Sequence, residues 1–125
     1  MDPRATNRPR ILIADDERLI ADTLSIILNQ NGYDTATAYS GRKAVEAARQ
    51  FRPNFFLGDV LMPDMTGIEA AIHIRAMVPE CRVLLLSGQA ATTDLLRDAR
   101  VRGHEFEILL KPVHPERLIE RLRSL

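Results

Sequence analysis

Short, continuously apolar runs recur along the chain, and each is followed by a segment with apolar residues at helical spacing. These runs are Ile11–Ala14, Phe55–Leu57, Val83–Leu86 and Ile108–Leu110. A strand that is apolar at every position is buried on both faces, as in a parallel sheet between two layers of helices. The pattern therefore predicts an α/β fold in which strands and helices alternate.

The remaining segments complete this alternation. Thr35–Tyr39 is β-prone but less apolar, as expected for a strand at the edge of a sheet. The size and order of the elements suit a doubly wound five-stranded parallel sheet of order 2-1-3-4-5, with helices on both faces. We expect the strands at Arg10–Ala14, Thr35–Tyr39, Phe55–Leu57, Val83–Leu86 and Ile108–Leu110, and the helices at Leu19–Leu28, Gly41–Phe51, Ile68–Val78, Thr92–Arg102 and from Pro115 onward.

Length and composition narrow the class of protein. The 125 residues suffice for one domain with its own core, expected at residues 10–125 after a flexible arm at residues 1–9. With 17 basic and 17 acidic residues, the formal net charge is zero, which disfavours direct binding of nucleic acid or of an anionic membrane. No apolar run approaches the ~20 residues of a membrane helix. Cys81 is the only cysteine, so an internal disulfide is excluded and a cytoplasmic location is expected.

Polar residues of a distinctive kind follow the central strands of the predicted sheet. Asp15 and Asp16 follow the first strand, Asp59 the third, Ser87 the fourth and Lys111 the fifth. The carboxyl ends of parallel strands meet at one edge, where ligands of such folds bind. Two carboxylates about 4 Å apart repel by roughly 4 kcal/mol at an effective dielectric constant near 20. The acidic cluster therefore indicates a cation, and its oxygen ligands suit Mg²⁺.

The same residues can support phosphoryl chemistry. A carboxylate can act as a nucleophile and form an aspartyl-phosphate, while Lys111 supplies a point charge and Ser87 a hydroxyl donor for phosphoryl oxygens. Each residue alone also has an ordinary explanation. The paired Asp residues suit a helix N-cap, Asp59 and Ser87 suit turns, and a lysine at a strand end is commonly solvated. Only the combination points to a phosphorylation site.

Four motifs, ADDE, GDVLMPDMTG, LLSG and LLKP, occur in this order after the predicted strands. Together they resemble the receiver domain of two-component response regulators, a flavodoxin-like fold, over about residues 10 to 124. The resemblance implies a bacterial signalling domain rather than an enzyme. It also implies that Asp59 accepts a phosphoryl group from a sensor histidine kinase or a phosphotransfer protein.

The resemblance assigns further roles at the site. Asp16 and Asp59 would bind Mg²⁺ directly, together with the backbone carbonyl of Leu61, and Asp15 would act through a metal-bound water. Ser87 and Lys111 would contact the phosphoryl oxygens. The peptide bond between the family's lysine and the following proline is usually cis.

Two positions depart from the family's pattern. Ile108 stands where most receivers carry the Tyr or Phe that reorients when the hydroxyl of the Ser87 position moves toward the phosphoryl group. We therefore predict a switch in which Ser87 still moves and the loops after the fourth and fifth strands repack. Gly58 stands where a larger apolar residue is more common, and we expect local flexibility there.

Two other functions compete with a phosphorylation switch. A receiver-like module that binds a partner without phosphorylation is favoured mildly by Ile108 and Gly58. A Mg²⁺-dependent phosphohydrolase would need a second Asp two residues after the nucleophile, and that position is Leu61. The sequence does not identify the output, and a homodimer through the helix at Thr92–Arg102, the strand at Ile108–Leu110 and the helix from Pro115 is compatible with it.

Overall fold

One parallel sheet of five strands, in the order β2-β1-β3-β4-β5, forms the centre of the molecule, as the sequence predicts. The computed structural model describes residues 7–88 and 92–125. The strands are β1 (Arg10–Ala14), β2 (Asp34–Ala38), β3 (Phe55–Asp59), β4 (Arg82–Ser87) and β5 (Glu107–Leu110). The helices are α1 (Arg18–Gln30), α2 (Gly41–Phe51), α3 (Gly67–Met77), α4 (Thr92–Val101) and α5 (Pro115–Ser124).

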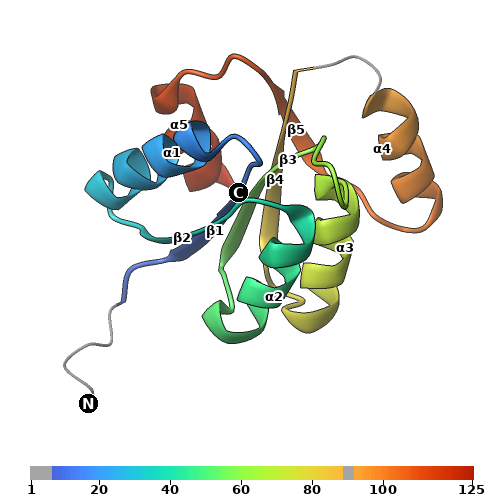
Figure 1. The fold of residues 1–125 in the computed structure, drawn as a ribbon, viewed down its shortest axis with the longest axis horizontal. Helices are drawn as coiled ribbons and strands as arrows, with labels where there is room; N and C mark the ends of the chain where they lie inside the picture. The colour runs from blue at the N-terminus through green and yellow to red at the C-terminus, as the bar shows by residue number, and fades with distance from the viewer. Residues whose placement is uncertain (1–6, 89–91) are drawn as a thin grey trace.

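The helices form two layers, with α1 and α5 on one side of the sheet and α2, α3 and α4 on the other (Figure 1). Alternate residues of the central strands supply the two cores. Ile11 and Ile13 belong to the apolar cluster that includes residues of α1 and α5, whereas Leu12 and Ala14 belong to the cluster on the opposite face. This confirms that the apolar runs of the central strands are buried on both faces. None of the helices in the described parts of the chain is long and apolar enough to cross a membrane.

The two edge strands differ in their exposure from the three central strands. The polar sequence of Asp34–Ala38 suits its edge position, as predicted. The expectation that Ile108–Leu110 is buried on both faces is wrong. Leu109 is buried, but Ile108 is only partly buried and the side chain of Leu110 is 72% exposed. The cause is the position of β5 at the open edge of the sheet, where one neighbouring strand is missing.

Gly58 has a packing role that the sequence did not indicate. A Cβ atom at this position would lie 2.7 Å from Cζ and 2.8 Å from Cε2 of the Phe56 ring. Both residues are in β3, two positions apart, so they point to the same face of the sheet. The absence of a side chain at Gly58 makes room for the fully buried Phe56 ring directly behind the end of the strand.

The segment before β1 contacts the end of α1. Arg8 donates hydrogen bonds to the main-chain carbonyl oxygens of Asn29 and Tyr33, and its Nε lies 3.6 Å from Oδ1 of Asp34. These contacts fall within the predicted arm at residues 1–9, of which residues 1–6 lie outside the described part of the chain.

Candidate functional site

The register of the sheet brings the predicted site residues to one edge. Ala14 is paired with Gly58, so Asp15 and Asp59 follow at the ends of neighbouring strands β1 and β3. Asp59 is in turn paired with Leu86, directly before Ser87. On the far side, Ser87 is paired with Leu110, and the N–H of Lys111 donates to the carbonyl oxygen of Ser87 at 2.8 Å. The convergence predicted from the strand ends is therefore confirmed.

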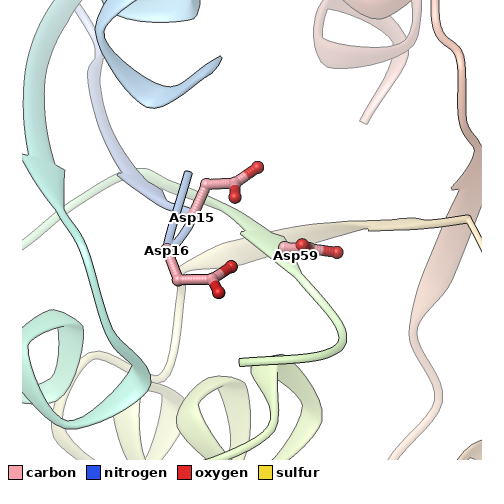
Figure 2. A group of neighbouring side chains, drawn as sticks. All are labelled: Asp15, Asp16 and Asp59. Carbon is pink, nitrogen blue, oxygen red and sulfur yellow. The ribbon is translucent and has the colours of Figure 1, made fainter. Parts of the chain in front are cut away.

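Three carboxylates gather at the ends of β1 and β3 (Figure 2). Asp15, Asp16 and Asp59 each offer an oxygen, and the three oxygens lie within 4.8 Å of one another. Asp15 is buried, Asp59 is partly buried and Asp16 is exposed. The main chain fixes Asp15, because its N–H donates to the carbonyl oxygen of Ala38 and its Oδ1 accepts the N–H of Glu17 at 3.0 Å.

Lys111 extends into this acidic cluster from the end of β5. Its Nζ lies 3.2 Å from Oδ2 of Asp59 and 3.4 Å from Oδ2 of Asp15. One ammonium group thus contacts two of the three carboxylates. The peptide bond between Lys111 and Pro112 is cis, as the resemblance implies.

The charges of the cluster perturb the pKa values of two groups. Burial raises the pKa of Asp59, and the neighbouring carboxylates of Asp15 and Asp16 add to the rise, although Lys111 opposes it. Burial alone would lower the pKa of Lys111, but the charges of Asp59 and Asp15 outweigh it and raise that pKa. The raised pKa of Asp59 and the raised pKa of Lys111 are consistent with each other. The single ammonium of Lys111 is shared among several carboxylates, so it gains more than one anionic neighbour while negative charge around Asp59 remains in excess.

The donor set fits Mg²⁺. Carboxylate oxygens from separate strand ends are hard ligands, and their clustering leaves excess negative charge that a divalent cation offsets. A hollow of about 320 Å³ opens at the same place, lined by Asp16, Glu17, Asp59, Leu61, Ser87, Gly88 and Lys111. The carboxylates and the residues around this hollow fit a site for Mg²⁺.

Binding of Mg²⁺ is expected to stabilise the fold measurably. A ligand present at about 100 times its Kd, and bound only by the folded state, stabilises by about 2.7 kcal/mol. For a domain of this size that corresponds to a rise in Tm of roughly 10 °C. The measurement is thermal unfolding with MgCl₂ against NaCl of equal ionic strength, with Asp16→Asn as the variant that removes one ligand. An equal rise in wild type and variant would place the cation elsewhere.

Ile108, the residue at the family's aromatic switch position, is in β5 and is not among the residues that line the hollow. Ile108 is partly buried and packs against the core on the side of α2, α3 and α4. Phe106, two residues earlier, stacks on His104 with ring centroids 6.0 Å apart and lies 5.0 Å from the Arg75 guanidinium carbon. Phe106 is therefore held by other contacts, and the chain places no aromatic ring at position 108.

Sequence reasoning missed two residues that line the hollow. Glu17 is the last residue of the ADDE motif and received no role, yet it is the N-cap residue of α1 and lines the hollow. Gly88, directly after Ser87, also lines the hollow. Proximity in sequence to Asp16 and Ser87 was the available signal for both.

The fold and the acidic cluster define a parallel α/β domain with a candidate cation site at the carboxyl ends of its strands, and comparison with known proteins identifies its family. Residues 11–123 match the family model of the response regulator receiver domain, and the chain belongs to that family. The probable transcriptional regulatory protein TcrX of Mycobacterium tuberculosis is 34% identical over 98% of this chain and 52% of its own length. The chemotaxis protein CheY of Thermotoga maritima is 29% identical over 93% of this chain and 96% of its own length.

Solved structures agree with this assignment. The CheY-like receiver domain protein of Methanospirillum hungatei has a TM-score of 0.86 and 25% identity, and the alignment covers 94% of this chain and 93% of that one. The chemotaxis protein CheY4 of Vibrio cholerae has a TM-score of 0.82 and 28% identity over 94% of this chain and 98% of that one. The chain spans about half the length of the first curated relatives it matches, such as TcrX and the DNA-binding response regulator MtrA.

Proposed function

We propose that this receiver domain accepts a phosphoryl group on Asp59 from the phosphohistidine of a sensor histidine kinase or a phosphotransfer protein. One observation carries the proposal: the Asp59 carboxylate lies 3.2 Å from Lys111 and belongs to a cluster of three carboxylates suited to Mg²⁺. The family is a signalling family, so the domain acts as a phosphoacceptor and not as a classical enzyme.

The proposed roles of the residues combine the resemblance to receiver domains with the contacts of the site. An Asp59 oxygen forms a bond to phosphorus while the bond from phosphorus to the histidine nitrogen breaks, and the electron pair stays on the imidazole. Lys111 neutralises charge on the oxygens of the transferring phosphoryl group, and the hydroxyl of Ser87 donates a hydrogen bond to one of these oxygens. Asp16, Asp59 and the carbonyl of Leu61 would hold Mg²⁺, and Asp15 would act through a bound water. The ion supplies further charge stabilisation when it is bound.

The first test is the intact mass of the protein after incubation with acetyl phosphate, with and without Mg²⁺. We expect the mass to increase by one phosphoryl group in the presence of Mg²⁺. We expect no increase when EDTA removes the metal before acetyl phosphate is added. No adduct from acetyl phosphate and none from a phosphohistidine donor, in a folded protein that fails to bind Mg²⁺, would contradict the proposal. That result would favour a module that binds its partner without phosphorylation.

Phosphorylation is expected to change the conformation of the partner-binding surface through a movement of Ser87, although position 108 is isoleucine and not an aromatic residue. Because Ile108 is already packed against the core, the movement of Ser87 is transmitted by repacking of the loops after β4 and β5. Amide chemical shifts with and without beryllofluoride, a phosphoryl analogue, measure this. We expect the largest changes at Ser87 to Gly88 and at Lys111 to His114. Unchanged shifts there, with the analogue bound, would refute this switch.

The partners beyond the phosphodonor are also proposals. The output is an attached domain or a separate protein, and the relatives named as DNA-binding or transcriptional regulators suggest control of transcription for the longer proteins of this kind. A homodimer through the face formed by α4, β5 and α5 is supported by exposed Val101 and Leu110, at 82% and 72%. The cytoplasmic location expected from the sequence remains a prediction.

A further inference from the structure

The loop between β3 and α3 is bound to the beginning of α2 by one side chain. The carboxylate of Asp64 accepts the N–H of Gly41 at 3.1 Å and the N–H of Arg42 at 2.9 Å. The next N–H of the helix, that of Lys43, is accepted at 3.1 Å by the hydroxyl of Ser40. These are N–H groups that have no acceptor inside their own helix. Most of the cap of α2 thus comes from a loop 23 residues away in sequence.

The electrostatics of this contact favour the ionised carboxylate. Burial alone would raise the pKa of Asp64, but the N–H groups of Arg42 and Gly41 outweigh it and the pKa is lowered. The positive end of the helix dipole acts in the same direction. Asp64 is therefore an anion at neutral pH, and its hydrogen bonds to α2 are charge-assisted.

The main chain of the loop also lies directly against the helix. A Cβ atom at Gly41 would lie 2.6 Å from the carbonyl oxygen and 2.8 Å from Cβ of Met65. Only glycine permits this approach without displacement of the loop. The lack of a side chain at Gly41 and the hydrogen bonds of the Asp64 carboxylate thus both favour close packing of the loop on the beginning of α2.

The other connections of the loop join this anchor to the acidic site. The N–H of Val60 donates to the carbonyl oxygen of Leu86 at 2.9 Å, and the N–H of Gly67 donates to the carbonyl oxygen of Val60 at 2.8 Å. Leu61 follows Val60 directly, lines the hollow beside Asp59 and stands three residues before Asp64. Sheet bonds thus fix the beginning of the loop, and Asp64 fixes its middle.

We infer that Asp64 is a positioning residue for the metal site: it holds the loop against α2 and so keeps the carbonyl of Leu61 where Mg²⁺ binds. The inference rests on the proposed function, in which that carbonyl is a ligand. Residues that orient ligands in this indirect way typically change metal affinity by about 10–100-fold when they are replaced.

The test is a Mg²⁺ titration followed by amide chemical shifts, since the chain has no tryptophan to report binding by fluorescence. Asp64→Ala removes the anchor, and Asp64→Asn retains one acceptor oxygen. The control acts on α2 alone: Glu46→Gln removes one exposed negative charge of that helix. The hydroxyl of Ser40 contacts Asp64 as well as the N–H of Lys43, so Ser40→Ala would disturb the same anchor and does not serve as a control.

We expect the Kd for Mg²⁺ to rise about tenfold in Asp64→Ala and less in Asp64→Asn, with Glu46→Gln within about twofold of wild type. Hydrogen exchange at Gly41 and Arg42 should accelerate in Asp64→Ala even without metal. If Glu46→Gln weakens Mg²⁺ binding as much as Asp64→Ala, or if neither does, the inference fails while the proposed function stands. If wild type itself binds no Mg²⁺, both fail.

Discussion

Asp59→Asn is expected to abolish phosphorylation by acetyl phosphate and by a histidine kinase, leaving no adduct in the intact mass. The amide occupies nearly the same volume as the carboxylate, but it has no anionic oxygen to attack phosphorus. Of the three carboxylates, Asp59 is the one that is both partly buried and in contact with Lys111 at 3.2 Å. Asp94→Asn, at an exposed position in the first turn of α4, is the matched control and should be phosphorylated like wild type. A phosphorylated Asp59→Asn protein would move the acceptor to another residue.

The same substitution is expected to stabilise the metal-free protein. Burial and the neighbouring carboxylates raise the pKa of Asp59 above its ordinary value of 3.8, which means that the folded state disfavours the ionised form. The penalty is present at neutral pH and is relieved as the pH falls through the raised pKa toward 3.8. Asp59→Asn should therefore unfold at a Tm a few degrees higher than wild type near pH 7 without metal, and the difference should shrink on acidification. A difference that grows toward acid pH would contradict the direction of the pKa shift.

Lys111→Met is expected to slow phosphorylation by about 10²–10³-fold, the usual cost of removing one group that stabilises charge in the transition state. Methionine keeps much of the apolar stem and removes the ammonium, which contacts Asp59 and Asp15 at 3.2 and 3.4 Å. The rate of appearance of the phosphorylated mass at fixed acetyl phosphate and Mg²⁺ measures the effect. Lys111→Arg keeps the charge and should retain more of the rate.

Loss of Lys111 should also weaken the fold, because Asp15 is only 2% exposed and would lose its ion pair with the Lys111 ammonium. Leaving a buried polar group without its partner costs about 1–3 kcal/mol. Mg²⁺ should restore much of this stability in Lys111→Met, since the metal supplies charge at the same carboxylates. Urea unfolding with and without Mg²⁺ measures both effects. A Lys111→Met protein that equals wild type without metal would show that Asp15 is compensated by other groups.

The sequence was sufficient for the sheet and for the groups that meet at its edge. The runs at Ile11–Ala14 and Val83–Leu86 are apolar throughout, so a buried place in a parallel sheet could be predicted for each of them. The polar residues that directly follow these runs then had to lie at the carboxyl edge of the sheet. Burial of Ile108–Leu110 was overestimated because an apolar run does not reveal how much a neighbouring layer covers an edge strand.

Contacts between side chains from distant segments could not be predicted in the same way. The bond from Asp64 to the N–H groups of Gly41 and Arg42 depends on how closely a loop approaches a helix, which no local pattern encodes. Likewise, the fit of the Phe56 ring over Gly58 depends on the ring's orientation. The sequence pattern identifies which side chains lie at the site, whereas tertiary packing determines how rigidly each of them is positioned.

The pairing of Phe56 with Gly58 has a consequence for the evolution of this domain. A side chain added at Gly58 meets the aromatic ring, and a smaller residue at Phe56 leaves an unfilled cavity close to the end of β3. Either change alone is costly, while a larger residue at 58 together with a smaller one at 56 can fill the same volume. The two positions should therefore change together in evolution, and related chains with a bulky residue at position 58 should lack the phenylalanine at position 56.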